Sequence, residues 1–357
     1  MDGIQSTPLD TNKLDSLLAR AIGDLSAGYG GVMVSLGNRL GLYKAMVGGG
    51  PLSAREVAAR AGCAERYVRE WLNAQVAGGY LVYHPISDTY ELTPEQAFVL
   101  ADENSPAFIP NAWAVPASMW FDEEKAVEAF RTGKGIPWGD HDGRLYCGVA
   151  AFYRNAYRAS LVTEWLPALD GVVSKLQEGA LVADIGCGHG HSTMLMAEAF
   201  PASRFRGFDT HDKSVAEARR LAVGQGIGHA SFDLARSDTY PGAGYDLICF
   251  FDCLHDMGDP VAAATHAAKA LAPDGTVMLV EPFANDRVED NTSPIARLYY
   301  AASTTICCAH SISDGGRLVL GAQAGEARLA EVFRRAGFTR FRRAAETPFN
   351  LILEARL

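Results

Sequence analysis

The amino-acid sequence predicts an α/β fold, with a mostly parallel sheet in the C-terminal half and a mainly α-helical N-terminal domain. Three observations lead to this prediction. From Gly179 onward, short apolar runs alternate with longer amphipathic segments, as strands and helices do in a parallel sheet. A glycine-rich turn, 186–190, follows the first of these runs, where open α/β sheets bind ligands. Over residues 17–46, by contrast, the apolar residues recur at helical spacing.

Length and composition limit the classes of protein to consider. A chain of 357 residues suits two domains, and 48% hydrophobic with 21% charged residues excludes disorder over most of its length. The net charge of −10 argues against a protein that mainly binds nucleic acid. No apolar run approaches the roughly 18 residues of a membrane span, and residues 1–15 lack a secretory pattern. Seven scattered cysteines do not suggest a disulfide framework, so we expect a cytoplasmic protein.

The N-terminal part reads as a helical domain over residues 1–105. Apolar residues at helical spacing over 17–46 predict two or more helices, interrupted around the glycines of 28–31. Ser53 can cap the next helix. The elements that follow are two helices and two short strands, at 54–61, 64–77, 80–83 and 89–92. Helix, turn, helix and hairpin is the order of a winged helix.

A winged helix can read DNA or serve as a dimerisation module, and charge favours the second role. Residues 51–92 hold four arginines and five acidic residues. On the second helix, Glu65 and Glu70 cancel Arg66 and Arg69, whereas a DNA-recognition helix normally carries a basic excess. We therefore expect no nucleic-acid partner. A transcription regulator that senses a small molecule stays an alternative.

The segment 106–177 is rich in aromatic residues and should be mostly helical. One interpretation is a packed core that links two domains. The other is a cap over a pocket for a flat organic molecule, because small-molecule sites are mostly apolar and aromatic. The candidates for contact with such a molecule are Trp138, Phe152, Tyr153 and Tyr157.

The third segment, 178–357, carries the predicted sheet. Its strands are expected at 180–185, 205–208, 230–234, 245–251 and 276–281. Helices are expected between them at 191–200, 214–223 and 260–271. Two last strands, 339–343 and 349–355, have no helix between them and should form an antiparallel hairpin at one edge.

The turn after the first strand carries the chemistry. Glycines at 186, 188 and 190 let the backbone turn sharply and let a ligand approach closely, although such a turn can also merely pack a helix on a sheet. Asp209 ends the second strand, 23 positions after Gly186, where a carboxylate can accept hydrogen bonds from ribose hydroxyls. Asp184, two residues before the first glycine, would repel a pyrophosphate but suits a ligand with an ammonium and a sulfonium group.

Two passages resemble known enzymes. The pattern Asp184-x-Gly186-x-Gly188-x-Gly190, with Asp209 and the closing hairpin, resembles class I S-adenosylmethionine-dependent methyltransferases over about 178–357. The passage containing Leu254-His255-Asp256 is similar to small-molecule O-methyltransferases, which also carry an N-terminal winged-helix dimerisation domain. The two-domain layout is similar to that of a bacterial group of uncharacterised methyltransferases.

This resemblance implies a Rossmann-like sheet, S-adenosylmethionine (SAM) as cofactor, S-adenosylhomocysteine (SAH) as its product, and a homodimer joined through the N-terminal domain. It also implies site residues. Those implied to hold the cofactor are Asp184, Gly186, Gly188, Gly190, Asp209, Thr210, Ser237, Asp238, Phe251 and Asp252, with Asp233 as an alternative to Asp238 near the adenine.

The resemblance places His255 at the position of the general base, oriented by Asp256 or Asp252. The alternative is that this histidine caps the next helix or packs under the cofactor. We expect no metal site, because His189, His191 and His211 cannot be placed on one face.

The expected function is methyl transfer to a small, aromatic or hydrophobic molecule, at oxygen. The alternatives are an N- or C-methyltransferase and, more distantly, an NAD-linked oxidoreductase.

Overall fold

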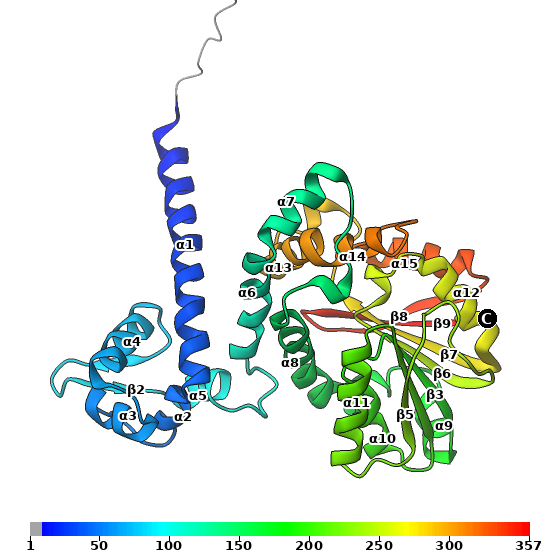
Figure 1. Cartoon of the computed structure of the whole chain (residues 1–357), viewed down its shortest axis with the longest axis horizontal. Helices are drawn as coiled ribbons and strands as arrows, with labels where there is room; N and C mark the ends of the chain where they lie inside the picture. The colour runs from blue at the N-terminus through cyan, green and yellow to red at the C-terminus, as the bar shows by residue number, and fades with distance from the viewer. Residues whose placement is uncertain (1–8) are drawn as a thin grey trace, which may run out of the picture. The chain divides into compact units, whose positions relative to one another are not determined.

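The computed structural model describes residues 9–357, which divide into two compact units, one up to Trp113 and one from Ala114 onward (Figure 1). Each unit has its own hydrophobic core. Across residues 9–357, none of the helices is both long and apolar enough to cross a bilayer.

The first unit is a winged helix preceded by one long helix, α1 (Thr11–Arg39). Ser53 caps α3 (Ala54–Ala61) with a capping box, as the sequence predicts. The other elements of the unit are α2 (Leu42–Met46), α4 (Glu65–Ala77), β1 (Val82–His84), β2 (Thr89–Glu91), α5 (Pro94–Leu100) and η1 (Pro110–Trp113). Strands β1 and β2 pair antiparallel and form the wing.

The expected interruption of the first helix at 28–31 is wrong, because α1 runs unbroken through these glycines. A Cβ on Gly31 would lie 2.2 Å from the indole ring of Trp113, and one on Gly37 would lie 2.5 Å from that of Trp71. These two glycines let aromatic rings pack directly on the helix backbone. In the sequence these two glycines therefore indicate close packing of a ring on the helix and not a turn.

The second unit begins with helices and continues as a sheet. The helical segments are α6 (Ala114–Phe121), α7 (Glu123–Thr132), η2 (Trp138–Asp140), α8 (Arg144–Ser160), η3 (Leu161–Trp165) and α9 (Val172–Glu178). The sheet has seven strands in the order β5-β4-β3-β6-β7-β9-β8. Their bounds are β3 (Leu181–Ile185), β4 (Arg204–Asp209), β5 (Ala230–Leu234), β6 (Tyr245–Phe251), β7 (Leu271–Pro282), β8 (Arg340–Glu346) and β9 (Asn350–Arg356).

Strands β3 to β7 pair in parallel, whereas β9 pairs antiparallel with both β7 and β8. The predicted fold class and closing hairpin are thereby confirmed. The chain order reverses direction across the sheet between β3 and β6, so their carboxyl ends flank a crevice.

Helices cover both faces of this sheet (Figure 1). On one face, α9, α10 (His191–Ala199) and α11 (Asp212–Gly224) bury apolar residues against the strands. On the other face, α12 (Pro260–Ala270) and α15 (Gly325–Arg335) do the same. The remaining short elements are η4 (Leu254–Asp256), η5 (Val288–Asp290), α13 (Pro294–Ala302), η6 (Ser303–Cys307) and α14 (Cys308–Ser313).

Candidate active site

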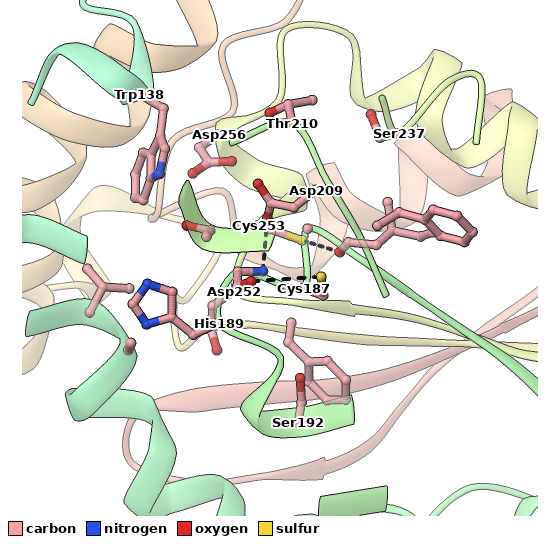
Figure 2. A pocket seen from close by; sticks show the side chains of 18 of the residues that line it. Trp138, Cys187, His189, Ser192, Asp209, Thr210, Ser237, Asp252, Cys253 and Asp256 are labelled. Atoms are coloured by element: carbon pink, nitrogen blue, oxygen red, sulfur yellow. Dashed lines mark hydrogen bonds between the residues drawn. The ribbon is translucent and has the colours of Figure 1, made fainter. Parts of the chain in front are cut away.

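A cavity of about 190 Å³ opens at the carboxyl ends of β3, β4, β5 and β6 (Figure 2). Most of the site residues predicted from the sequence line it. From the strand ends and the turns that follow them these are Gly186, Gly188, Asp209, Thr210, Ser237, Phe251 and Asp252. From the helical segment before the sheet they are Trp138, Tyr153 and Tyr157.

The glycine turn needs its glycines for two reasons. Gly186, Gly188 and Gly190 all have positive φ angles, of 73°, 52° and 74°, which side chains rarely adopt. A Cβ on Gly190 would also lie 2.5 Å from the ring of Phe232. The backbone N–H of Gly186 donates to the carbonyl oxygen of Phe208 at 2.7 Å, which ties the turn to β4. The bare backbone of this turn thus forms one wall of the cavity.

Asp209 stands at the end of β4 with its carboxylate held by the backbone. One oxygen accepts a hydrogen bond from the N–H of Gly188 at 2.9 Å, and the other accepts from the N–H of His211 at 2.8 Å. Each carboxylate oxygen can accept more than one hydrogen bond. The side chain is therefore fixed at the cavity edge with acceptor capacity left for a ligand.

Asp184 is completely buried and does not line the cavity. Its Oδ2 accepts hydrogen bonds from the hydroxyls of Ser192, at 2.7 Å, and Thr193, at 2.5 Å, in the first turn of α10. Burial raises the pKa of this carboxyl to about 6, although the two hydroxyls oppose that rise. Its Oδ1 is buried and has no hydrogen-bond partner among the described residues.

Asp252 lies just beyond β6 and has a positive φ of 50°, which is unusual for a residue with a side chain. Its Oδ2 accepts a hydrogen bond from the hydroxyl of Tyr157 at 2.9 Å, and its Oδ1 accepts from the amide of Asn350 at 2.7 Å. Burial, and then the neighbouring Glu281, raise the pKa of Asp252 to about 8.

His255 is buried and does not line the cavity. Its Nδ1 bonds to the carboxylate of Glu281 on β7, and its side chain also meets the thiol of Cys307. Burial alone would lower the pKa of this imidazole, but Glu281 and Cys307 raise it well above its usual value. The hydrogen-bonded carboxylate is thus Glu281, where the sequence pointed to Asp252 or Asp256.

Besides Asp184 and His255, the predicted residues Gly190, Asp238 and Phe152 and the alternative Asp233 do not line the cavity. Gly190 is covered by Phe232, as described above. Asp238 pairs with Arg236 at 3.2 Å, and the alternative near the adenine, Asp233, pairs with Arg219 at 3.2 Å. The ring of Phe152 packs against those of Tyr153 and Phe349.

At the cavity rim, sequence reasoning missed Asp314 and His310, which come from a distant segment. The guanidinium of Arg236 pairs with Asp314 at 2.9 Å, and the ring of His310 lies 5.9 Å from that of Trp138. No local pattern could have joined these residues, because 78 positions separate the first pair. His191 also lines the cavity, and burial lowers its pKa to about 4, so a neutral imidazole faces inward. Within 9–357, no group of three or more His, Cys, Asp or Glu side chains could hold a metal ion.

Comparison with known proteins decides the family. A family model described as a methyltransferase domain matches residues 155–339, which is more than half of the chain. The chain belongs to this methyltransferase family. A second model, described as an Rv2258c-like winged HTH domain, matches residues 28–102 and confirms the predicted winged helix. The match to the methyltransferase model covers β3 to β7 and most of the residues that line the cavity.

Individual relatives match in part. A trans-aconitate 2-methyltransferase of Variovorax paradoxus is 30% identical over 145 residues, which are 40% of this chain and 52% of the relative. A similar enzyme of Streptomyces avermitilis is 32% identical over 109 residues, or 30% of this chain and 40% of the relative. The chain thus spans about half the length, or less, of these relatives.

Solved structures match over the full length. Mitomycin 7-O-methyltransferase has a TM-score of 0.66 at 20% identity, covering 98% of this chain and 100% of that one. Human N-acetylserotonin methyltransferase, in complex with SAM, has a TM-score of 0.69 at 16% identity, covering 99% of each chain. At these identities the likeness shows the fold, with both the winged helix and the sheet included.

Proposed function

We propose that this member of the methyltransferase family binds SAM in the cavity and transfers its methyl group to the oxygen of a small aromatic or hydrophobic molecule in the cytoplasm. The observation that carries the proposal is the meeting of the glycine turn with Asp209 in one cavity. The turn offers bare backbone, and the carboxylate offers acceptors for a ribose.

Different residues contact the different parts of the cofactor. Gly186 and Gly188 allow its methionine part to approach the backbone, and Asp209 with Thr210 receives the ribose. Ser237 lines the cavity after β5, on the side of the adenine. Asp184 reaches the amino group through a water molecule, because its buried Oδ1 lacks a partner within the described residues. When bound, SAM supplies an electrophilic methyl group on a sulfonium.

Aromatic side chains support an organic acceptor. Trp138, Tyr153 and Tyr157 line the cavity, and such walls suit a flat molecule. Several of the full-length structural neighbours are named O-methyltransferases, whereas the partial sequence relatives are named for a carboxylic acid acceptor. The match over the whole chain favours the former group and, with it, an oxygen acceptor.

The hypothesis that His255 is the general base stays a prediction. For this role the imidazole has to exchange its contact with Cys307 for the acceptor oxygen, because it does not line the cavity as it stands. We expect His255→Ala to lose most of its turnover while SAH affinity stays unchanged. Equal turnover in this variant would leave His255 as part of the buried packing only.

Binding and transfer can be tested separately. Calorimetry should show binding of SAH and SAM but not of NAD. Labelled SAM should then transfer its methyl group to members of a panel of phenols, carboxylic acids and amines. Absence of SAH binding contradicts the proposal. Methylation of amines or carbon alone would replace the oxygen acceptor by the N- or C-methyltransferase alternative.

We also propose that α1 joins two copies of the chain. Large apolar residues of α1 are exposed at alternating spacings of four and three, as in a coiled coil, namely Leu18, Ile22, Leu25, Tyr29 and Val32. The charges of α4 support this role over DNA reading, because Arg66 pairs with Glu70 and Arg69 pairs with Asp88.

Light scattering tests this interface. Leu25→Lys places a charge in the apolar stripe and should yield monomers. Ala27→Lys changes the same helix off the stripe and should leave a dimer. A wild-type monomer would contradict the proposal.

A further inference from the structure

Asp252 is a partly buried carboxyl group in the cavity wall (Figure 2). Both of its hydrogen-bond partners are neutral. A phenol hydroxyl of Tyr157 and an amide of Asn350 donate to its two oxygens. The neighbouring histidine, His255, is bonded to Glu281 instead. A carboxylate in such a place lacks a bonded cation, so an ionised Asp252 would gain from a cationic ligand.

The fold places this carboxyl group firmly. The N–H of Asp252 donates to the carbonyl of Val280 at 2.7 Å, which continues the pairing of β6 with β7 past the strand end. The left-handed backbone that follows aims the side chain at Tyr157 on α8 and Asn350 on β9. Backbone strain of this kind persists where the surroundings enforce it, often at ligand sites.

Several titratable groups face Asp252 from the neighbouring elements. Glu281 on β7 disfavours ionisation of Asp252, and His255 on η4 favours it. The other titratable groups with an electrostatic link to Asp252 are Tyr153, Tyr157, Cys253 and Tyr299. Burial outweighs the favourable contacts, and the raised pKa of about 8 leaves the Asp252 carboxyl mostly neutral at pH 7.

We propose that Asp252 is the counter-charge for the sulfonium of SAM, losing its proton when SAM binds and regaining one when the methyl group leaves. This inference deepens the proposed function and rests on it. It gives the cavity a means to favour charged SAM over neutral SAH, and so to release the product.

The protons and charges balance over one cycle. Binding of SAM sends the proton of Asp252 to solvent. In transfer, the bond from the methyl carbon to sulfur breaks and its electron pair stays on sulfur, while a bond to the acceptor oxygen forms. The acceptor hydroxyl loses one proton, and Asp252 takes up one.

Calorimetry measures this coupling without any acceptor. Titrations of SAM at pH 7 in phosphate and in Tris, whose ionisation enthalpies differ, count the protons released. We expect close to one proton released per SAM and none attributable to the protein with SAH. The ratio of SAM affinity to SAH affinity should rise up to about tenfold from pH 6 to pH 7.

Variants identify the carboxyl group. In Asp252→Asn the release of a proton on SAM binding should disappear, while the affinity for SAH changes little. The titration of the ligand's own amino group cancels between wild type and this variant. Thermal unfolding checks that the variant folds. Tyr157→Phe keeps the carboxyl group of Asp252 but removes a hydrogen bond to its ionised form. The ratio of SAM affinity to SAH affinity should therefore rise at a higher pH than in wild type.

Three outcomes overturn the inference. Proton release that persists in Asp252→Asn assigns it to another group, and Asp256→Asn, at a second carboxyl in the cavity wall, then shows whether that group is Asp256. Equal binding of SAM and SAH without proton release rejects the counter-charge while leaving the proposed function intact. Failure of both ligands to bind rejects the proposed function as well.

Discussion

The carboxyl ends of β4 and β6 each present an aspartate to the same cavity, but the two side chains are held differently. Asp209 accepts from two backbone N–H groups within the turns that surround it. Asp252 accepts from two side chains that lie 95 and 98 positions away in the sequence. The first arrangement joins the turns after two adjacent strands, with its farther donor 21 positions away, whereas the second brings together a helix and a strand from distant parts of the chain. Just beyond Asp252, His255 also takes its bonded partner from another strand, because Glu281 lies on β7, 26 positions away.

The largest expected effect concerns the buried pair of His255 and Glu281 beyond β6. His255→Ala leaves Glu281, only 1% exposed, without its imidazole, and removing one partner of a buried pair costs about 3–5 kcal/mol. Urea unfolding at pH 7 measures the loss. The matched control is His84→Ala, whose pair with Glu91 is more than 30% exposed on each side and should matter far less. Equal losses in both variants would contradict the buried role.

The same pair gives a pH dependence. Because the folded protein raises the pKa of His255 above its unfolded value of about 6.5, the stabilisation is complete below that pH. It is lost as the pH rises through the folded pKa. The difference in unfolding free energy between wild type and His255→Ala should therefore shrink from pH 6 to pH 10. A difference that grows would reverse the assigned direction.

The next largest effect concerns Asp209 at the end of β4. Asp209→Ala removes the carboxylate that we propose to hold the ribose, and loss of hydrogen bonds to a charged group weakens binding by about 1.5–3 kcal/mol. SAH affinity by calorimetry should fall about 10- to 150-fold. Asp274→Ala, at an exposed aspartate paired with Lys175, should bind SAH like wild type. Unchanged affinity in Asp209→Ala would show that the ribose lies elsewhere.

A smaller effect tests the glycine turn that separates the two strand ends. Gly186 has a φ of 73°, and an added Cβ would lie 2.8 Å from Sγ of Cys253. Gly186→Ala should therefore cost about 1–3 kcal/mol of stability, measured by chemical unfolding. Gly228→Ala, at a site with open space and no positive φ, should cost little. A turn that tolerates Ala at 186 would not need its glycine.

The smallest effect concerns the donors to Asp184. Thr193→Val keeps the shape of the side chain but removes one of two hydroxyls that bond to this buried carboxyl group. The loss should be about 1–2 kcal/mol in unfolding free energy. Thr163→Val, at an exposed threonine bonded to the carbonyl of Ala159, is the control. Equal stabilities would mean that Ser192 alone satisfies Asp184.

Local patterns revealed much of this molecule. The period of the apolar residues located every strand of the large sheet, because alternation and capping depend on neighbours along the chain. The glycine turn and Asp209 were found for the same reason, since strand end, turn and helix start follow one another directly. The glycines at 28–31 of α1 were misread as an interruption, because the ring that explains Gly31 comes from Trp113, far along the chain.

By itself the sequence determined the class of sheet, the winged helix and the glycine turn with its acid. Only the tertiary structure decided that Glu281 bonds to His255, that Asp252 meets Tyr157 and Asn350, and that Trp138 reaches the cavity. The physical reason is distance along the chain. Hydrogen bonds within a turn are dictated by a few neighbouring residues, whereas a buried carboxyl group takes its partners from whatever strands and helices the sheet brings together.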